Sequence, residues 1–306
     1  MLMLCRKAAL ALSVVVVLGG CRAESSVGAA TGRPELRISM RPTEILSAFL
    51  SLPQFSAHVV AIGDSEKRLE ALQEGKIDVA NAVADVTYLA FNGRLPSHAP
   101  PMQKIRGMAL INRAVIHVLV GPTIDPRRGF RGLRIVLGDP TSGNASLGER
   151  LVNSTGVPTS DIHGEFAPYD VAVDRLLNGN VDAAILAVMP AQEPVARALR
   201  GGARLVEIDG PEVDRLCVHY PLLRRTLLPA GTYPAQDKPL HTVGVDLMLV
   251  CRADLSNDVA YALTRALFED VPQRIRRQLD PQRAPATVIP LHPGAARYYR
   301  ERELSR

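Results

Sequence analysis

Residues 69–82 read Leu-Glu-Ala-Leu-Gln-Glu-Gly-Lys-Ile-Asp-Val-Ala-Asn-Ala. Apolar residues recur at helical spacing up to Gly75, which supplies the left-handed conformation that ends a helix, and small apolar residues follow Asp78 as in a strand. Residues 176–184 (Leu-Leu-Asn-Gly-Asn-Val-Asp-Ala-Ala) repeat this design. We expect Asp78 and Asp182 to accept hydrogen bonds from turn amides. Two such helix–turn–strand units predict an α/β protein with two lobes of similar build.

Short apolar strands and amphipathic helices alternate around both units. In the first, we expect strands at 36–40, 58–62 and 78–82 and helices at 43–50 and 65–74. In the second, we expect strands at 134–137 and 183–188 and helices at 142–154, 170–177 and 192–199. This alternation predicts that each lobe is a mostly parallel sheet flanked by helices.

Two long β-rich stretches, Ala109–Val120 and Thr242–Cys251, flank the second unit, and a helix is expected at 257–268. We interpret the two stretches as strands that cross between the lobes. Lobe 1 would then comprise residues 35–118 plus 244–306, and lobe 2 residues 119–243. Such an arrangement has a cleft between the lobes and a hinge at the crossings.

The N-terminus resembles a bacterial lipoprotein leader. Arg6 and Lys7 precede an apolar run that is too short to span a membrane, and Gly19 and Gly20 stand before Cys21. We predict a signal peptide at 1–20, lipidation of Cys21 and a flexible tether at 21–34; the alternative is a plain secretory signal that contains a cysteine. The residue after Cys21 is arginine, not the aspartate that retains lipoproteins in the inner membrane, so the sequence favours a periplasmic position on the outer membrane.

Charge and cysteine content exclude several classes of protein. The formal net charge is +5, the leader contributes two of the basic residues, and the others are scattered with no aromatic residues among them, so no nucleic-acid surface is expected. Cys217 and Cys251 could form one disulfide or remain separate thiols. No zinc spacing and no nucleophile motif occur, and the histidines are dispersed, so we expect a protein without metal or cofactor that is not an enzyme.

Two strand–turn–helix junctions carry residues suited to an anion. After the strand at 134–137, Thr141, Ser142, Gly143 and Asn144 would open a helix, whose free amides and side-chain donors suit a carboxylate. The residues Asp64-Ser65 stand in the same order in the first lobe and would face them across the cleft. In each case the alternative is an ordinary helix cap.

The order and spacing of several motifs resemble the TAXI-class solute receptors of TRAP-type transporters. The resemblance is carried by residues 85–93, 138–144, 228–237, 242–254, 259–268 and 289–301. It implies a type II-like periplasmic-binding-protein fold and a small carboxylate ligand, such as glutamate or a related organic acid, that is delivered to a membrane permease. His292 would be a packing and turn residue, with a role at the permease surface as the alternative.

This chain departs from that family after its first strand. The family's glycine-rich loop is replaced by Ile-Ser-Met-Arg-Pro-Thr-Glu-Ile (38–45), so either Arg41 clamps the carboxylate or binding is weakened. Ala84 occupies a position that is usually polar in the family, so a hydrogen bond to the ligand is lost there. We therefore do not carry the identity of the family's ligand over to this chain. The predicted ligand-binding residues are Ser39, Arg41, Asp64, Ser65, Asp85, Thr141, Ser142, Gly143, Asn144 and Met189. The alternative function is a signalling or interaction lipoprotein that reports to a membrane partner.

Overall fold

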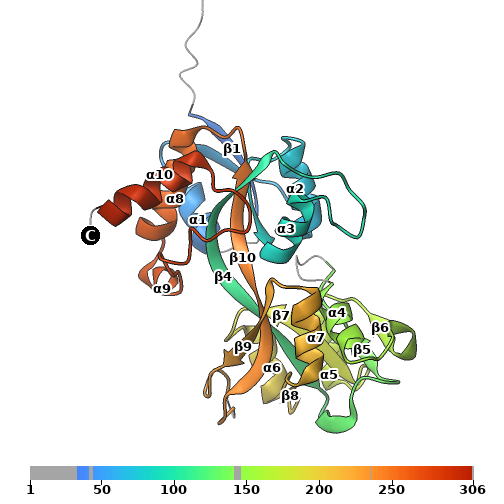
Figure 1. The fold of residues 1–306 in the computed structure, drawn as a ribbon. Coiled ribbons are helices and arrows are strands. Elements are labelled where there is room, and N and C mark those ends of the chain that lie inside the picture. Colours follow the sequence, from blue (N-terminus) through green and yellow to red (C-terminus); the bar gives the residue numbers. More distant parts are fainter. Residues whose placement is uncertain (1–32, 41–43, 141–145, 235, 305–306) are drawn as a thin grey trace, which may run out of the picture. The chain divides into compact units, whose positions relative to one another are not determined.

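The computed structural model describes residues 33–40, 44–140, 146–234 and 236–304, and residues 33–306 form one compact unit (Figure 1). Its strands belong to one sheet in the order β2-β1-β3-β10-β4-β7-β5-β6, with β8 paired to β4 and β9 to β10. No helix in these described ranges is long and apolar enough to cross a membrane. The predicted leader and all of the predicted tether before Arg33 lie outside them.

The first lobe opens with the predicted alternation. Its elements are β1 (Glu35–Ser39), α1 (Glu44–Leu50), β2 (Ser56–Val59), α2 (Ser65–Gln73), β3 (Val79–Val83) and α3 (Ala84–Phe91). Strand β1 lies parallel to both β2 and β3. The carboxyl ends of β1 and β3 therefore lie at the same edge of the sheet, where side chains of α/β proteins meet their ligands.

Two long antiparallel strands, β4 (Ile105–Val120) and β10 (Leu240–Arg252), join the lobes. Strand β10 pairs with β9 (Leu223–Leu228) through its first half and with β3 through its second half. Strand β4 continues into the second lobe, where its last residues pair with β7 (Ala183–Val188) and β8 (Arg204–Val206). Each strand thus belongs to both lobes, as the sequence predicted for residues 109–120 and 242–251.

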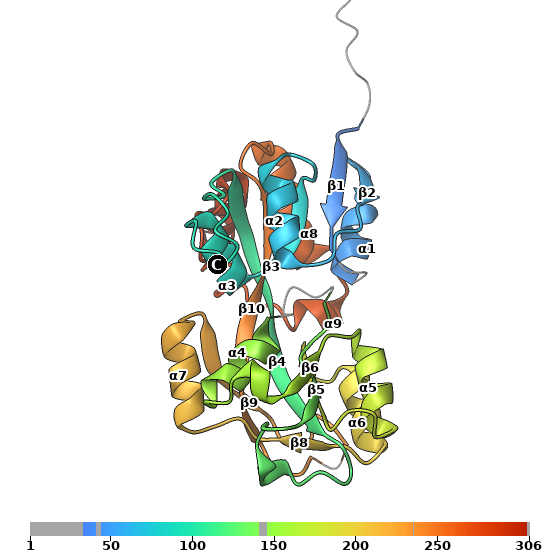
Figure 2. The ribbon, with the colours of Figure 1, turned by 90° about the vertical axis from the view of Figure 1, so that its right-hand side faces the viewer.

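The second lobe adds β5 (Arg134–Val136) and β6 (His163–Glu165), which are parallel to each other, and β5 is parallel to β7. Its helices are α4 (Leu147–Ser154), α5 (Tyr169–Leu177), α6 (Glu193–Arg200) and α7 (Pro211–His219). Figure 2 shows α4 and α7 on one side of the sheet and α5 and α6 on the other. The last helices, α8 (Asn257–Glu269), α9 (Gln273–Arg276) and α10 (Pro293–Leu304), return to the first lobe (Figure 1).

The fold class is confirmed: the protein is a two-lobed α/β protein with two crossing strands. The parallel pairs lie at the outer parts of the sheet, and every pair that involves β4 or β10 is antiparallel. Gly75 and Gly179 adopt the predicted left-handed conformation, with φ of 71° and 72°. Cys217 and Cys251 are both free, which resolves the alternative in favour of separate thiols.

Asp78 and Asp182 have a different role from the predicted one. Asp78 accepts hydrogen bonds from the backbone and guanidinium nitrogens of Arg37, and Asp182 accepts the same set from Arg134. The first pair joins β1 to the start of β3, and the second joins β5 to the start of β7. Burial raises the pKa of Asp78, but the bonds from Arg37 and the charges of Arg37 and Arg252 outweigh it and hold the pKa below its ordinary value.

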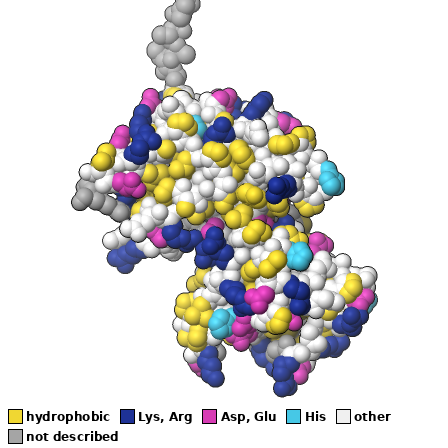
Figure 3. All heavy atoms as spheres, viewed as in Figure 1, with side chains coloured by type: hydrophobic (Ala, Val, Ile, Leu, Met, Phe, Trp, Pro, Cys, Tyr) yellow, Lys and Arg dark blue, Asp and Glu magenta, His cyan; other side chains and the backbone are white. Residues whose placement is uncertain are grey.

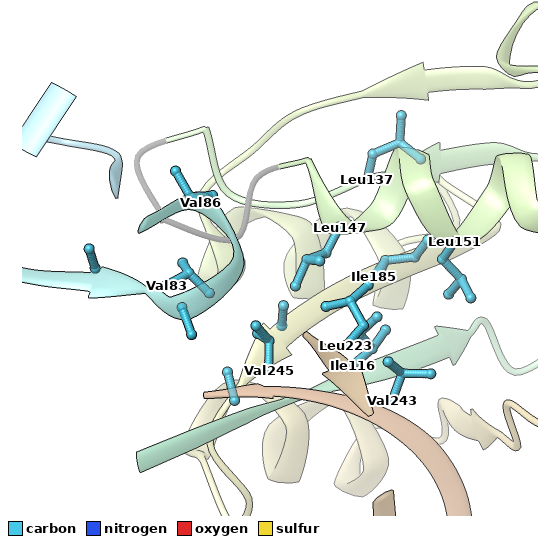
Figure 4. Packing of buried hydrophobic residues seen from close by; sticks show 14 of the residues in the cluster. Val83, Val86, Ile116, Leu137, Leu147, Leu151, Ile185, Leu223, Val243 and Val245 are labelled. Carbon is cyan, nitrogen blue, oxygen red and sulfur yellow. The ribbon is translucent and has the colours of Figure 1, made fainter. Parts of the chain in front are cut away.

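The largest cluster of buried apolar side chains runs through both lobes. Val83 and Val86, at the end of β3 and the start of α3, belong to the same cluster as Ile116, Ile185 and other residues of the second lobe (Figure 4). The other two clusters each lie within one lobe. Apolar contact between the lobes removes hydrocarbon from water and stabilises their association.

Candidate functional site

A cavity of about 470 Å³ lies between the two lobes. The first lobe contributes Asp64, Ser65, Glu66, Val86, Leu95 and Pro96, and the second contributes Pro140, Ser146, Glu149, Arg150, Asn153 and Tyr220. Its volume lies in the usual range of small-molecule sites. A solute held here would touch both lobes, which is the condition for a ligand to favour one arrangement of the lobes over another.

An ion pair crosses from one lobe to the other beside this cavity. Asp85, in the first turn of α3, pairs through Oδ2 with a guanidinium nitrogen of Arg150 on α4. Their side chains are only 6% and 10% exposed, so the pair is shielded from solvent. The guanidinium also lies over the ring of Tyr220, 4.5 Å from its centroid. Burial and stacking hold Arg150 at the cavity wall.

The carboxylate of Asp85 is only half satisfied. Its Oδ1 atom is buried and has no hydrogen-bond partner. The hydroxyl of Ser39, at the carboxyl end of β1, is in the same condition, and that residue is 1% exposed. A buried polar atom without a partner costs about 1–3 kcal/mol of stability. The structure therefore holds two unsatisfied polar groups near one edge of the first lobe's sheet. Both belong to residues predicted for ligand binding, but neither residue is among the described residues that line the cavity.

Asp64 and Ser65 line the cavity as predicted, but each also has a structural role. Asp64 caps α2 by accepting from the amide of Lys67, and its carboxylate pairs with the Lys67 ammonium. The buried Ser65 hydroxyl accepts a hydrogen bond from the amide of Val83 and so joins α2 to the end of β3. The helix-cap interpretation of this junction is therefore correct, and it leaves both residues at the cavity wall.

The other predicted site residues are placed differently. Met189 follows β7 and is half-buried, but it is not among the described residues that line the cavity. Arg41, Thr141, Ser142, Gly143 and Asn144 lie outside the described residues, as does Cys21. Helix α4 is described only from Leu147, so the predicted helix start at Ser142 also falls outside.

Helix α4 supplies the residues that sequence reasoning missed. Ser146, Glu149, Arg150 and Asn153 all line the cavity, and they recur at the spacing of one helix face. Leu147 and Leu151, on another face of α4, are buried in the core. A polar stripe beside an apolar one was visible in the sequence, but nothing there indicated that the polar stripe faces the other lobe.

A buried histidine links three segments of the second lobe. The Nε2 atom of His117 lies 2.9 Å from the hydroxyl of Tyr233, and its Nδ1 atom lies 3.3 Å from the carbonyl of Leu186. Burial lowers the pKa of His117 to about 4, so the imidazole is neutral at physiological pH. His292 is also buried and accepts at Nδ1 from the amide of Gly294. The prediction that His292 serves packing and a turn is confirmed.

A second cavity lies within the second lobe. It has a volume of about 330 Å³ and is mostly apolar, and its rim carboxylates Asp125, Glu207 and Asp209 are paired with arginine or histidine. On the face drawn in Figure 3, basic and acidic side chains are intermixed over both lobes. Among the residues that the structure describes, no three His, Cys, Asp or Glu side chains gather as metal ligands.

Solved structures of low sequence identity share this fold. XAC2383 from Xanthomonas citri, solved with ATP, matches 87% of this chain and 94% of its own at 12% identity, with a TM-score of 0.52. PhnD1 from Prochlorococcus marinus, solved with methylphosphonate, matches 81% of this chain and 89% of its own at 12% identity, with a TM-score of 0.51. The aliphatic sulphonate binding protein SsuA from Escherichia coli matches 87% and 83% at 16% identity, with a TM-score of 0.45.

A family model shows which protein family the chain belongs to, whereas the solved structures show the fold alone. The model of the NMT1-like family matches residues 45–302, which include most of both lobes, both crossing strands and every described residue of the cavity. The chain therefore belongs to the NMT1-like family, with the fold of two-lobed periplasmic binding proteins.

Proposed function

We propose that this protein is an extracytoplasmic receptor that captures a small solute between its lobes and presents it to a membrane transporter. The observation that carries the proposal is the cavity lined by both lobes, with the Asp85–Arg150 pair across it. Bound solute would stabilise the arrangement in which both walls contact it, and a transporter can recognise that arrangement. No chemical step is required of the site, so the proposed function is not enzymatic.

The proposed solute is a small carboxylate, glutamate-like or a related organic acid. Arg150 is the cationic side chain among the described lining residues, and its planar guanidinium suits a carboxylate. Arg41 and residues 141–144, which we predict from the sequence as anion-binding, follow directly on described segments that end at Met40 and Pro140. The proposed partner is the permease of a TRAP-type secondary transporter, from the TAXI-class resemblance.

Thermal-shift screening of the purified protein against carboxylic acids and amino acids tests this proposal. A solute that binds only the native state raises the unfolding midpoint, by an amount that grows with its concentration relative to Kd. We expect a small carboxylate to raise the midpoint of the wild type and to lose most of that effect in Arg150→Met. Arg134→Met is the matched control, because Arg134 is paired with Asp182 at the start of β7 and does not line the cavity. An equal shift in both variants would contradict the proposed site.

The proposed location is the periplasmic face of the cell envelope, with a lipid anchor on Cys21, in the outer membrane. We expect Cys21→Ser to release the protein from membranes while its unfolding midpoint stays that of the wild type, because the predicted tether separates the anchor from the folded body. Membrane pelleting in high salt is the measurement. A Cys21→Ser protein that still pellets would show that something other than a lipid holds it.

A further inference from the structure

The cavity within the second lobe opens into the main core of the protein, and the proposed function does not use it. Its volume of about 330 Å³ is at the lower end of the usual range for small-molecule sites. Its walls include Val118 and Val120 of β4, Leu133 before β5 and Leu151 of α4, which all belong to the apolar cluster that runs through both lobes. The exposed Gly129 also lines the cavity, so this apolar interior is reached from the surface.

A loop held at both ends forms one wall of this cavity. Phe130 lines the cavity from the loop that connects β4 to β5. Near the start of the loop the Arg204 guanidinium donates to the carbonyl of Ile124, and near its end the amide of Gly132 donates to the carbonyl of Asp161. These bonds oppose collapse of the wall onto the core. An apolar body that entered the cavity would therefore take exposed hydrocarbon out of water.

The charged side chains that line the cavity are all acidic. Four carboxylates belong to the lining: Asp125, Glu207, Asp209 and Glu212. None of the described lining residues is an arginine, a lysine or a histidine. Hydrogen bonds from the Arg127 side chain and from the amides of His241 and Gly210 hold the pKa of the first three, respectively, below their ordinary values. These three are therefore ionised at neutral pH.

The cations that pair with these carboxylates stand outside the cavity. Arg127, Arg225 and His241, the partners of the first three, are not among the described lining residues. The Oε1 atom of Glu212 lies 3.9 Å from the guanidinium of Arg215, beyond hydrogen-bond distance. A molecule inside the cavity would thus meet carboxylate oxygens and no protein cation, so a positive group is favoured there and a negative group is repelled.

We propose that this cavity is a second small-molecule site, which binds an amine with an apolar body. The apolar body, about the size of an aromatic ring, fills the space between β4, α4 and Phe130, and the ammonium group contacts the rim carboxylates. The inference does not depend on the proposed function, because the site lies within one lobe and shares no described lining residue with the inter-lobe cavity.

The test compares three probes on the purified full chain by isothermal titration. Phenethylamine and phenylpropionate carry the same phenylethyl body with opposite charges, and ethanolamine carries the ammonium group without an apolar body. We expect phenethylamine to bind at least about tenfold more tightly than either of the others, because the acid meets like charges and ethanolamine leaves the apolar walls in water. Equal affinity for phenethylamine and phenylpropionate, or no binding of phenethylamine, would overturn the inference.

Two variants locate the bound amine. Val157→Phe adds an aromatic ring at a half-buried lining position and should weaken phenethylamine binding about tenfold or more, whereas Val171→Phe, an exposed change on α5, should not. Glu212→Gln should reduce the preference for phenethylamine over phenylpropionate by about threefold. Its control is Glu165→Gln, because Glu165 has a similarly exposed carboxylate in the same lobe that does not line the cavity.

Wild-type affinity for phenethylamine in the Val157→Phe protein would show that the amine binds elsewhere and would overturn the inference. An unchanged preference in Glu212→Gln would do the same. Where Val157→Phe does not fold, the Glu212→Gln comparison decides the question, because that change is partly exposed and breaks no hydrogen bond to Arg215.

Discussion

Burial determines the protonation state of His117. His117 lies in β4 with its ring held between the hydroxyl of Tyr233 and the carbonyl of Leu186, and it is 1% exposed. Because burial disfavours the charged imidazolium, the pKa falls from its ordinary 6.5 to about 4. The residue is a neutral structural element, as its place in a predicted strand indicated.

This pKa shift predicts a pH dependence of stability. Between pH 6.5 and pH 4 the unfolded chain binds a proton at His117 that the native protein does not bind, so acidification favours unfolding. Stability from this residue is fully present above pH 6.5 and is lost as the pH falls towards 4. We expect a loss of about 2 kcal/mol between pH 7.5 and pH 5 from this residue. Urea unfolding of wild type and His117→Gln at both pH values measures it.

His58 provides the control for this experiment, because its side chain is exposed on β2 and pairs with the exposed carboxylate of Glu35. His58→Gln should follow the wild-type pH dependence, whereas His117→Gln should show a smaller loss on acidification. If the two variants and the wild type lose stability in parallel, His117 is not the group that titrates.

At the residue scale, the sequence located part of the cavity wall. Asp64 and Ser65 cap and open α2 and line the cavity, whereas Ser39 and Asp85 are not among the described residues that line it. Arg150 could not be found in this way. Its partner Asp85 is 65 residues away in the chain and in the other lobe, so the pair depends on how two lobes meet, which no local pattern encodes.

At the scale of elements, the placement of α4 depends on one glycine. A Cβ atom at Gly148 would lie 1.8 Å from the carbonyl oxygen of Leu137, at the end of β5. Only a residue without a side chain lets α4 pack this closely against the strand. Because Arg150 stands two residues later on the same helix, this contact also positions the cation at the cavity.

We therefore expect Gly148→Ala to destabilise the protein by about 1–3 kcal/mol, because the new methyl group pushes α4 away from β5. Solute binding should weaken as well, since the same displacement moves Arg150. Gly121→Ala is the control: its nearest neighbours would be 3.7 Å away, an ordinary contact. Urea midpoints and solute titrations of both variants are the measurements, and a Gly148→Ala protein as stable as Gly121→Ala would disprove the close contact.

Elements with strong periodicity were predictable and others were not. The strand at 183–188 has the predicted bounds, and the helix at 257–268 is one residue longer in the structure. Helix α10 was not predicted, because Pro293–Leu304 mixes glycine, tyrosine and many charges without a clear apolar face. Its stability comes from packing: Tyr298 and Tyr299 are buried against the core, and the Tyr299 hydroxyl donates to the carbonyl of Met108.

At the scale of the whole molecule, the crossing strands are tied by ion pairs where they pass between the lobes. Asp246 of β10 faces Arg113 of β4 in register and accepts from its Nε and Nη2 atoms at 2.8 and 3.3 Å. Arg283 donates to the same carboxylate. Strand β10 changes its partner from β9 to β3 at this point, so Asp246 lies where β10 passes from one lobe to the other.

Removal of the Asp246 carboxylate leaves the guanidinium groups of Arg113 and Arg283 without the carboxylate that they share. We expect Asp246→Ala to lower the free energy of unfolding by about 1–3 kcal/mol, the range for losing hydrogen bonds to charged groups. Asp125→Ala is the control, since its pair with Arg127 is exposed to solvent and should change the midpoint little. If Asp246→Ala and Asp125→Ala have the same urea midpoint, the ion pairs of Asp246 do not stabilise the fold.

The crossing strands also fix the order in which the chain can finish folding. When the chain emerges N-terminus first, the residues of β1 to β3 are available early, but β10, the antiparallel neighbour of β3, is synthesised much later. Arg113 likewise precedes its partner Asp246 by 133 residues. Most of the second lobe lies between the two crossings and can assemble in the meantime, except that β9 also pairs with the first half of β10. The first lobe is therefore completed last. Until Leu247–Cys251 can pair with β3, that strand has an unpaired edge, and chaperones would protect the chain there from aggregation.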